Sequence, residues 1–170
     1  MERSGVVSRG VNPLTLLGPA LAPGDRAPGF SALANDLSPK GLSDFSGKVL
    51  VLASVPSLDT PVCEIETKRF NKEAAALGPD VAIVTVSMDL PFAQKRFCAA
   101  EGIGAVTTLS DHRDADFGMK YGVLIKELRL LARAVFVADR KGVLTHVEIV
   151  PDISKEPDYD KVLAAVSAAL

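Results

Sequence analysis

The two cysteines, Cys63 and Cys98, are the residues of this sequence with the most distinctive chemistry. A chain of 170 residues with only two cysteines cannot build the multi-bridge framework of a small disulfide-rich protein. Such a pair is either two inert core thiols or a reactive couple. Free cysteine is among the residue types most often buried, so composition by itself favours the inert interpretation.

Cys63 follows residues that predict the start of a helix. Thr60 is a favoured N-cap residue and Pro61 a favoured first helical residue, so Cys63 is expected in the first turn. Backbone N–H groups there have no helical acceptor, and the helix dipole is positive at this end. Both effects favour a thiolate, the nucleophilic form of cysteine. The residues alone leave open whether Cys63 is reactive or only packed.

Other patterns give no comparable site. His112 and His146 lack the spacing of metal ligands. The pattern Gly102-x-Gly104 does not open a helix after a strand, so it does not indicate a dinucleotide-binding loop. No Cys-x-x-Cys pair occurs, which argues against a disulfide oxidoreductase of the thioredoxin type. We therefore expect neither a metal nor an organic cofactor.

The elements that must position Cys63 alternate between strands and helices. Strands are predicted over 48–55, 81–88, 106–109, 133–138 and 143–150, of which the first two are continuously apolar. Helices are predicted over 61–77, 91–100, 114–121 and 157–170, and an N-terminal hairpin from 6–7 and 14–17. This order predicts an α/β fold with a central mixed sheet flanked by helices, a thioredoxin-like arrangement. Sites in such sheets gather where strands end and helices begin, as at Cys63.

Several segments together resemble a known family. The pattern Pro56-x-x-x-Thr60-x-x-Cys63 resembles the signature of peroxiredoxins. Further strings are similar to the atypical two-cysteine branch of that family, the thiol peroxidases: Ser54–Thr60, Asp89–Cys98, Leu130–Val135, Asn12–Thr15 and Glu156–Tyr159. The resemblance covers essentially the whole chain, so residues 1–170 are expected to form one thioredoxin-like peroxiredoxin domain.

The resemblance implies a role for each of five residues. Cys63 would be the peroxidatic cysteine, which becomes a sulfenic acid, and Cys98 the resolving cysteine, which forms a disulfide with it in the same chain. Thr60 would hold the thiolate and a peroxide oxygen, Pro56 would shield the pocket, and Arg133 would bring a guanidinium to the sulfur. The implied substrates are hydrogen peroxide and organic hydroperoxides, the implied reductant is thioredoxin, and the implied assembly is a homodimer active in antioxidant defence.

Alternatives to these roles remain. Arg133 could form a salt bridge to a carboxylate such as Glu64, and Cys98 could pack in a plain core helix with Phe92, Phe97 and Ala100.

Pro61 stands where the family often has glycine and could stiffen the turn. A catalytically inactive thioredoxin-fold binding protein would be expected to lack Thr60 or Arg133. A copper-handling relative would need two close cysteines and a nearby histidine.

Charge and hydropathy exclude other classes of partner. The net charge is -2, and the charged residues are scattered along the chain. No basic face that could bind nucleic acid is indicated. No apolar run approaches the ~18 residues of a membrane span. Gly18 and Pro19 interrupt the one segment that could pass for a signal peptide, residues 14–22, so a cytoplasmic protein is expected.

The predicted placement of the cysteines also implies motion. Packed helices lie about 8–10 Å apart, whereas a disulfide needs Cα atoms within about 7 Å. We therefore expect the reduced form to hold the sulfurs apart, and the Cys63 turn or part of the Cys98 helix to unwind before they bond. Replacing Arg133 with alanine is expected to slow the reaction and leave the fold intact.

Overall fold

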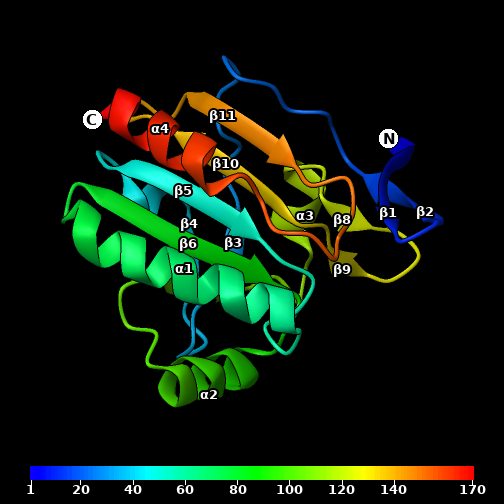
Figure 1. Ribbon diagram of the computed structural model, residues 1–170, viewed down its shortest axis with the longest axis horizontal. Helices are drawn as coiled ribbons and strands as arrows, with labels where there is room; N and C mark the ends of the chain where they lie inside the picture. Colours follow the sequence, from blue (N-terminus) through cyan, green and yellow to red (C-terminus); the bar gives the residue numbers. More distant parts are fainter.

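The computed structural model describes residues 1–170 and contains two sheets (Figure 1). The strands are β1 (Glu2–Arg9), β2 (Asn12–Leu17), β3 (Ser31–Leu33), β4 (Pro39–Gly41), β5 (Val49–Ser54), β6 (Val81–Ser87), β7 (Thr107–Ser110), β8 (Leu124–Ile125), β9 (Leu130–Leu131), β10 (Ala134–Ala138) and β11 (Leu144–Ile149). The helices are the 3₁₀-helix η1 (Leu42–Phe45) and the α-helices α1 (Pro61–Leu77), α2 (Pro91–Glu101), α3 (Asp116–Lys120) and α4 (Tyr159–Ala169).

The larger sheet is mixed, as the sequence predicts. Its strand order is β11-β10-β5-β6-β7-β3-β4, with β5 parallel to β6 and antiparallel to β10. All residues of β5 and β10 are buried, because both faces of the sheet are covered. The smaller sheet, β1-β2-β8-β9, contains the predicted N-terminal hairpin and lies at the end of the molecule that holds the N-terminus (Figure 1).

Alternate side chains of β5 serve two cores, one on each face of the sheet. Val49 and Val51 pack on the face that α1 and α4 cover, together with Phe70 and Val166 (Figure 1). Leu50 and its alternates join the larger core on the other face, which includes the aromatic residues Phe30, Phe117, Tyr121 and Phe136. The predicted helix 61–77 is therefore anchored along its apolar face, and its first turn lies at the end of β5.

Helix α2 differs from a plain core helix. Phe92 is 64 % exposed, and the buried residues of the helix are Pro91 and Gln94. The Gln94 side-chain amide donates to the Leu109 carbonyl at 2.8 Å and to the Ser87 hydroxyl at 2.9 Å. These bonds attach α2 to the ends of β6 and β7. Of the predicted packing residues, Phe97 is partly buried and Ala100 is exposed. The helix is held against the ends of β6 and β7 by polar contacts that leave part of its surface in solvent.

Several boundaries differ from the sequence predictions. The short strands β3, β4, β8 and β9 and the helix η1 were not predicted, because segments of two to four residues show no periodicity. Arg133, expected to open a strand, directly precedes β10. The helical spacing of the predicted segment 157–170 puts Leu170 on one face with Val162 and Val166, but Leu170 is 54 % exposed, because α4 ends at Ala169. None of the helices combines the length and apolar character that crossing a bilayer requires.

Candidate active site

The loop between β5 and α1 is fixed in shape by Asp89. Its carboxylate accepts hydrogen bonds from the Ser57 hydroxyl at 2.7 Å and from the Leu58 N–H at 2.8 Å. The Ser87 hydroxyl donates to the same carboxylate at 2.7 Å. Because Asp89 follows β6, it joins the ends of two parallel strands to the loop that leads to Cys63. Asp89 was not predicted as a site residue, although it opens one of the strings that carry the family resemblance.

Helix α1 begins at the predicted residues. Thr60 is the N-cap, and its hydroxyl oxygen accepts the Cys63 N–H at 3.4 Å and donates to the Ser57 carbonyl at 3.0 Å. Pro61 is the first helical residue. Pro56, earlier in the loop, is buried. The capping chemistry thus places Cys63 in the first helical turn, where N–H groups and the helix dipole favour an anion.

The Cys63 side chain is fully buried in a small apolar cluster. Val55 and Leu58 from the preceding loop pack around it, and Phe97 from α2 lies against the same cluster. The Arg133 guanidinium enters this cluster, with Nη2 at 3.2 Å from the Cys63 Sγ. An arginine that is 1 % exposed needs anionic or polar partners, because an unpaired buried charge is strongly unfavourable.

Arg133 contacts the Cys63 sulfur and also forms a salt bridge to a carboxylate, so both roles considered from the sequence occur together. The carboxylate is Glu66 and not Glu64. The Arg133 Nη1 donates to Glu66 Oε2, and its Nε and Nη2 donate to the Ile153 carbonyl at 3.3 and 3.0 Å. Glu64, the carboxylate suggested from the sequence, instead pairs with Lys68 at 2.7 Å on the surface. The reason is helical geometry: residues three apart share a face, so Glu66 lies beside Cys63 while Glu64 turns away. That spacing is the signal that could have identified Glu66.

Glu66 is an unusual carboxylate because it is buried. Burial raises its pKa to about 7, even though the adjacent Arg133 acts in the opposite direction. Its second oxygen, Oε1, has no hydrogen-bond partner. For Arg133, burial would lower the pKa, but the Glu66 carboxylate and the Cys63 sulfur raise it overall. The guanidinium therefore stays charged, and the Glu66 carboxyl and the Cys63 sulfur both bind to it.

The raised pKa of Glu66 predicts a pH-dependent stability. In the unfolded chain this carboxyl ionises near pH 4.5, whereas in the folded protein it stays protonated to about pH 7. The protonated carboxyl therefore contributes its full stabilisation below pH 4.5. As the pH rises from 4.5 to 7, this contribution to the free energy of unfolding falls by on the order of 3 kcal/mol. Glu66→Gln should remove this dependence. Urea unfolding of both proteins at pH 4.5 and 7 measures it, and equal pH slopes would refute the assignment.

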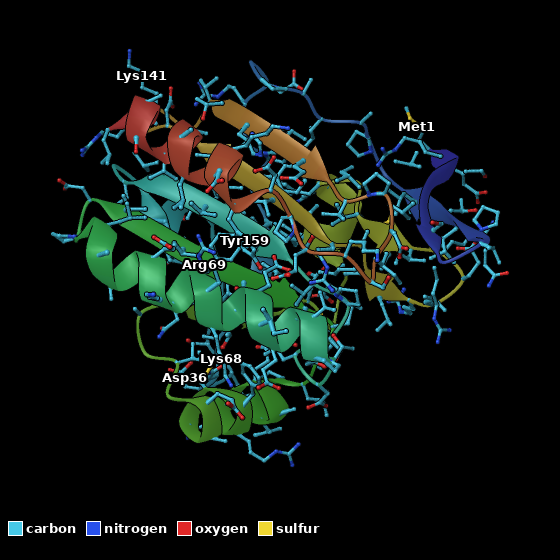
Figure 2. The ribbon with its side chains drawn as sticks, viewed as in Figure 1. Met1, Asp36, Lys68, Arg69, Lys141 and Tyr159 are labelled. Atoms are coloured by element: carbon cyan, nitrogen blue, oxygen red, sulfur yellow. The ribbon has the colours of Figure 1, made fainter.

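Tyr159 ties α4 to α1. The Arg69 guanidinium lies 4.8 Å from the centre of the Tyr159 ring, and the Phe70 ring meets it edge-on at 5.5 Å. Figure 2 shows Arg69 and Tyr159 between the two helices. The Tyr159 hydroxyl donates to Glu156 at 2.8 Å. This contact holds in place the helix that carries Cys63.

Cys98 belongs to different surroundings. It is partly exposed on α2, and its Sγ lies 3.5 Å from the Thr108 hydroxyl, which in turn donates to the Asn35 side chain at 3.0 Å. Both cysteines are free thiols. The structure thus brings Thr60, Cys63 and Arg133 together through hydrogen bonds, with Pro56 in the same loop. Cys98 lies outside this group, although its neighbour in the sequence, Phe97, packs against the cluster around Cys63.

Comparison with known proteins agrees with this geometry. The Redoxin family matches residues 22–163. A thiol peroxidase from Oceanobacillus iheyensis is 60% identical over 153 residues, which cover 90% of this chain and 93% of that protein. The crystal structure of a peroxiredoxin-like protein from Aquifex aeolicus is 47% identical and has a TM-score of 0.91, with 99% of this chain and 98% of that chain covered.

A more distant structure shows that the fold is shared beyond these relatives. A thiol peroxidase from Chromobacterium violaceum is only 22% identical but has a TM-score of 0.85, with 95% of each chain covered. The predicted fold class and the predicted family are both confirmed. The chain therefore belongs to the Redoxin family and, within it, to the thiol peroxidases, which are peroxidase enzymes of the peroxiredoxin type with a thioredoxin-like fold.

Proposed function

We propose that Cys63 is the peroxidatic cysteine of this enzyme and that Arg133 activates it. The Cys63 thiolate attacks the terminal oxygen of a hydroperoxide, the O–O bond breaks, and the products are a Cys63 sulfenic acid and an alkoxide or hydroxide. A proton converts the leaving group into an alcohol or water. The observation that carries this proposal is the contact of 3.2 Å between Arg133 Nη2 and the Cys63 Sγ in a buried cluster.

The neighbouring groups supply the rest of the proposed site. The Thr60 hydroxyl, which already accepts the Cys63 N–H, is positioned to hold a peroxide oxygen. The guanidinium offers fixed positive charge where negative charge develops on the leaving oxygen, which is the most effective form of electrostatic catalysis. Pro56 is buried in the loop and keeps water from the sulfur. An inactive binding protein would have no use for a charged arginine held against a thiol at this position.

The proposed substrates are hydrogen peroxide and organic hydroperoxides. The test is steady-state consumption of hydrogen peroxide and cumene hydroperoxide in the presence of thioredoxin, its reductase and NADPH. Turnover with either peroxide supports the proposal. An absence of turnover with both peroxides, in a protein whose Cys63 reacts with a thiol reagent, would favour the alternative of an inactive thioredoxin-fold binding protein with structural cysteines.

We propose further that Cys98 resolves the sulfenic acid within the same chain. The Cys98 thiolate attacks the Cys63 sulfur, the S–O bond breaks, water leaves after protonation, and a disulfide forms. Thioredoxin would then reduce the disulfide by exchange, which returns both thiols. The partial exposure of Cys98 supports this order, because an incoming dithiol can reach that sulfur more readily than the buried Cys63.

Cys98→Ser should separate the two half-reactions. The variant should consume about one equivalent of peroxide per chain at the wild-type rate, because Cys98 takes no part in the attack, and then stop turning over with thioredoxin. Stopped-flow peroxide consumption and a thioredoxin-coupled assay measure the two steps. Continued thioredoxin-dependent turnover at the wild-type rate would contradict the resolving role.

Formation of the disulfide should require local opening. Cys63 is enclosed by Val55, Leu58 and Phe97, while Cys98 faces Thr108, so the two sulfurs have different partners. Lys68 adds a link between the two helices, since it pairs with Glu64 on α1 and, at 2.6 Å, with Glu101 at the end of α2 (Figure 2). Pro61, which fixes one backbone angle in the first turn, should slow the unwinding.

Amide exchange tests this opening. Residues 61–68 and 92–101 should exchange faster in the disulfide form than in the reduced form, because helix ends open at low local free energy. The central strand β5 (49–54) serves as the internal control and should stay protected in both forms. Equal protection of both helical segments in the two redox states would overturn the expectation.

The remaining proposals concern the setting of the enzyme. A homodimer is proposed on the family resemblance, and sedimentation of the purified protein measures it. A cytoplasmic location is proposed because this chemistry needs both thiols to be reduced again after each cycle. The physiological role that follows from the peroxidase assignment is antioxidant defence.

A further inference from the structure

A cavity of about 570 Å³ lies at the opposite end of the sheet from Cys63. Its walls come from the segment around η1, the start of β5, the turn between β10 and β11, and α3. Strand β5 begins next to this cavity and ends next to the active-site loop, a separation of roughly 20 Å for six residues. In Figures 1 and 2, Lys141 of the cavity rim lies at the end from which β5 starts, and α1 begins at the other end.

The walls of the cavity are strongly basic. Five cationic side chains line it and only two carboxylates: Arg26, Lys48, Lys120, Arg140 and Lys141 against Asp116 and Asp139. The chain as a whole carries a net charge of -2. The cavity therefore concentrates positive charge on a protein that is otherwise slightly acidic, and clefts lined by one sign of charge raise the local concentration of the opposite ion.

Both carboxylates already have partners. Asp116 pairs with Lys120 at 3.0 Å and accepts the Ser31 N–H at 2.8 Å. Asp139 accepts the N–H groups of Lys141 at 2.9 Å and Val143 at 3.0 Å, which fixes the β10–β11 turn. The acidic groups thus shape the rim and neutralise one of the five cations.

Three cations remain without a counter-charge. Arg140 lies 3.7 Å from Asp80 and donates to the Gly47 carbonyl at 3.4 Å, which links the turn to the start of β5. Arg26, Lys48 and Lys141 form no ion pair within 4.0 Å and no side-chain hydrogen bond with the protein. These three groups come from separate segments that converge on one cavity, so their charge is available to a ligand that carries several negative charges.

The floor of the cavity is apolar and partly aromatic. Phe30 is buried there and is held by edge contacts with Phe117 at 5.1 Å and Tyr121 at 5.9 Å. Leu42 and Phe45 of η1 are partly buried beside it. A ligand that fits both surfaces needs an anionic end and a flat apolar end, and the volume is within the range of small-molecule sites.

We propose that this cavity binds a phosphate ester of the nucleotide class. The phosphates would meet Arg26, Lys48 and Lys141, since guanidinium and ammonium groups form charge-assisted hydrogen bonds to phosphate oxygens. The base would lie on Leu42 and Phe45. The site is separate from the peroxidase centre and does not depend on the roles proposed for Cys63 and Cys98.

The test is calorimetric titration of the full reduced chain with ATP, tripolyphosphate, adenosine and citrate, without divalent metal and at two salt concentrations. One ATP should bind per chain. Tripolyphosphate should bind at least about fivefold more weakly, and binding should weaken with salt because the contacts are ionic. Adenosine should give no saturable heat, and citrate should bind more weakly than ATP.

Matched variants locate the site. The double variant Lys48→Ser/Lys141→Ser should weaken ATP binding at least tenfold, whereas Lys72→Ser, which removes an exposed lysine on α1, should leave it unchanged. Both variants should retain wild-type peroxidase activity, which shows that they fold. Absence of saturable ATP binding, or equal losses in both variants, would overturn the site. Tripolyphosphate or citrate binding as tightly as ATP would overturn the nucleotide class.

Discussion

Replacing Cys63 with serine is expected to lower peroxide turnover by at least about a thousandfold. A serine hydroxyl is almost never ionised at neutral pH, and it cannot form a sulfenic acid. The side chain is fully buried beside Arg133, so the change removes the nucleophile and leaves the surrounding contacts of Val55 and Leu58 in place. Coupled assays with hydrogen peroxide measure the effect.

The control for this variant is Cys98→Ser, which should still consume one equivalent of peroxide. Urea unfolding should show that the Cys63→Ser protein is folded, because the serine side chain is smaller than cysteine and fits in the same space. Peroxide turnover within tenfold of the wild-type rate in folded Cys63→Ser protein would end the assignment of Cys63 as the nucleophile.

Removing Arg133 is expected to have the second largest effect, and it should act on both rate and stability. Arg133→Ala withdraws the cation that lies 3.2 Å from the Cys63 Sγ, so attack on peroxide should slow by about a hundredfold. Stopped-flow kinetics of peroxide consumption measure this change.

The same substitution leaves Glu66 buried without its partner. Above pH 7, where the Glu66 carboxyl is ionised in the wild-type protein, breaking this buried ion pair should lower stability by about 3–5 kcal/mol, so the sequence-based expectation of an intact fold is revised. The double variant Arg133→Ala/Glu66→Gln separates the two effects. It should regain much of the stability, because no unpaired charge stays buried, and it should remain slow. Recovery of the rate in the double variant would show that Arg133 acts through folding alone.

Local chemistry made the first part of the site predictable. Thr60 and Pro61 determine where α1 begins through capping and a fixed backbone angle, and both act within a few residues. The strands β5 and β6 could also be predicted, because each is a continuous run of mostly apolar residues. These features, taken together, place Cys63 at the end of a central strand without any knowledge of the rest of the chain.

Contacts between distant segments could not be derived in this way. Arg133 is 70 residues from Cys63, and in the sequence only the family resemblance relates the two. Glu66 was overlooked although its helical spacing from Cys63 was visible, because a buried carboxylate is identified by its partner. The docking of α2 through Gln94 was hidden for the same reason, since nothing in the sequence marks that amide as buried.

The most direct test of the central claim is to trap the oxidised sulfur. Cys98→Ser protein, treated with one equivalent of hydrogen peroxide and then with dimedone, should carry a single dimedone adduct, and peptide mass spectrometry should locate it on Cys63. Protein left without peroxide should carry none. An adduct located elsewhere, or peroxide consumed with Cys63 still a free thiol, would contradict the assignment of Cys63 as the peroxidatic cysteine.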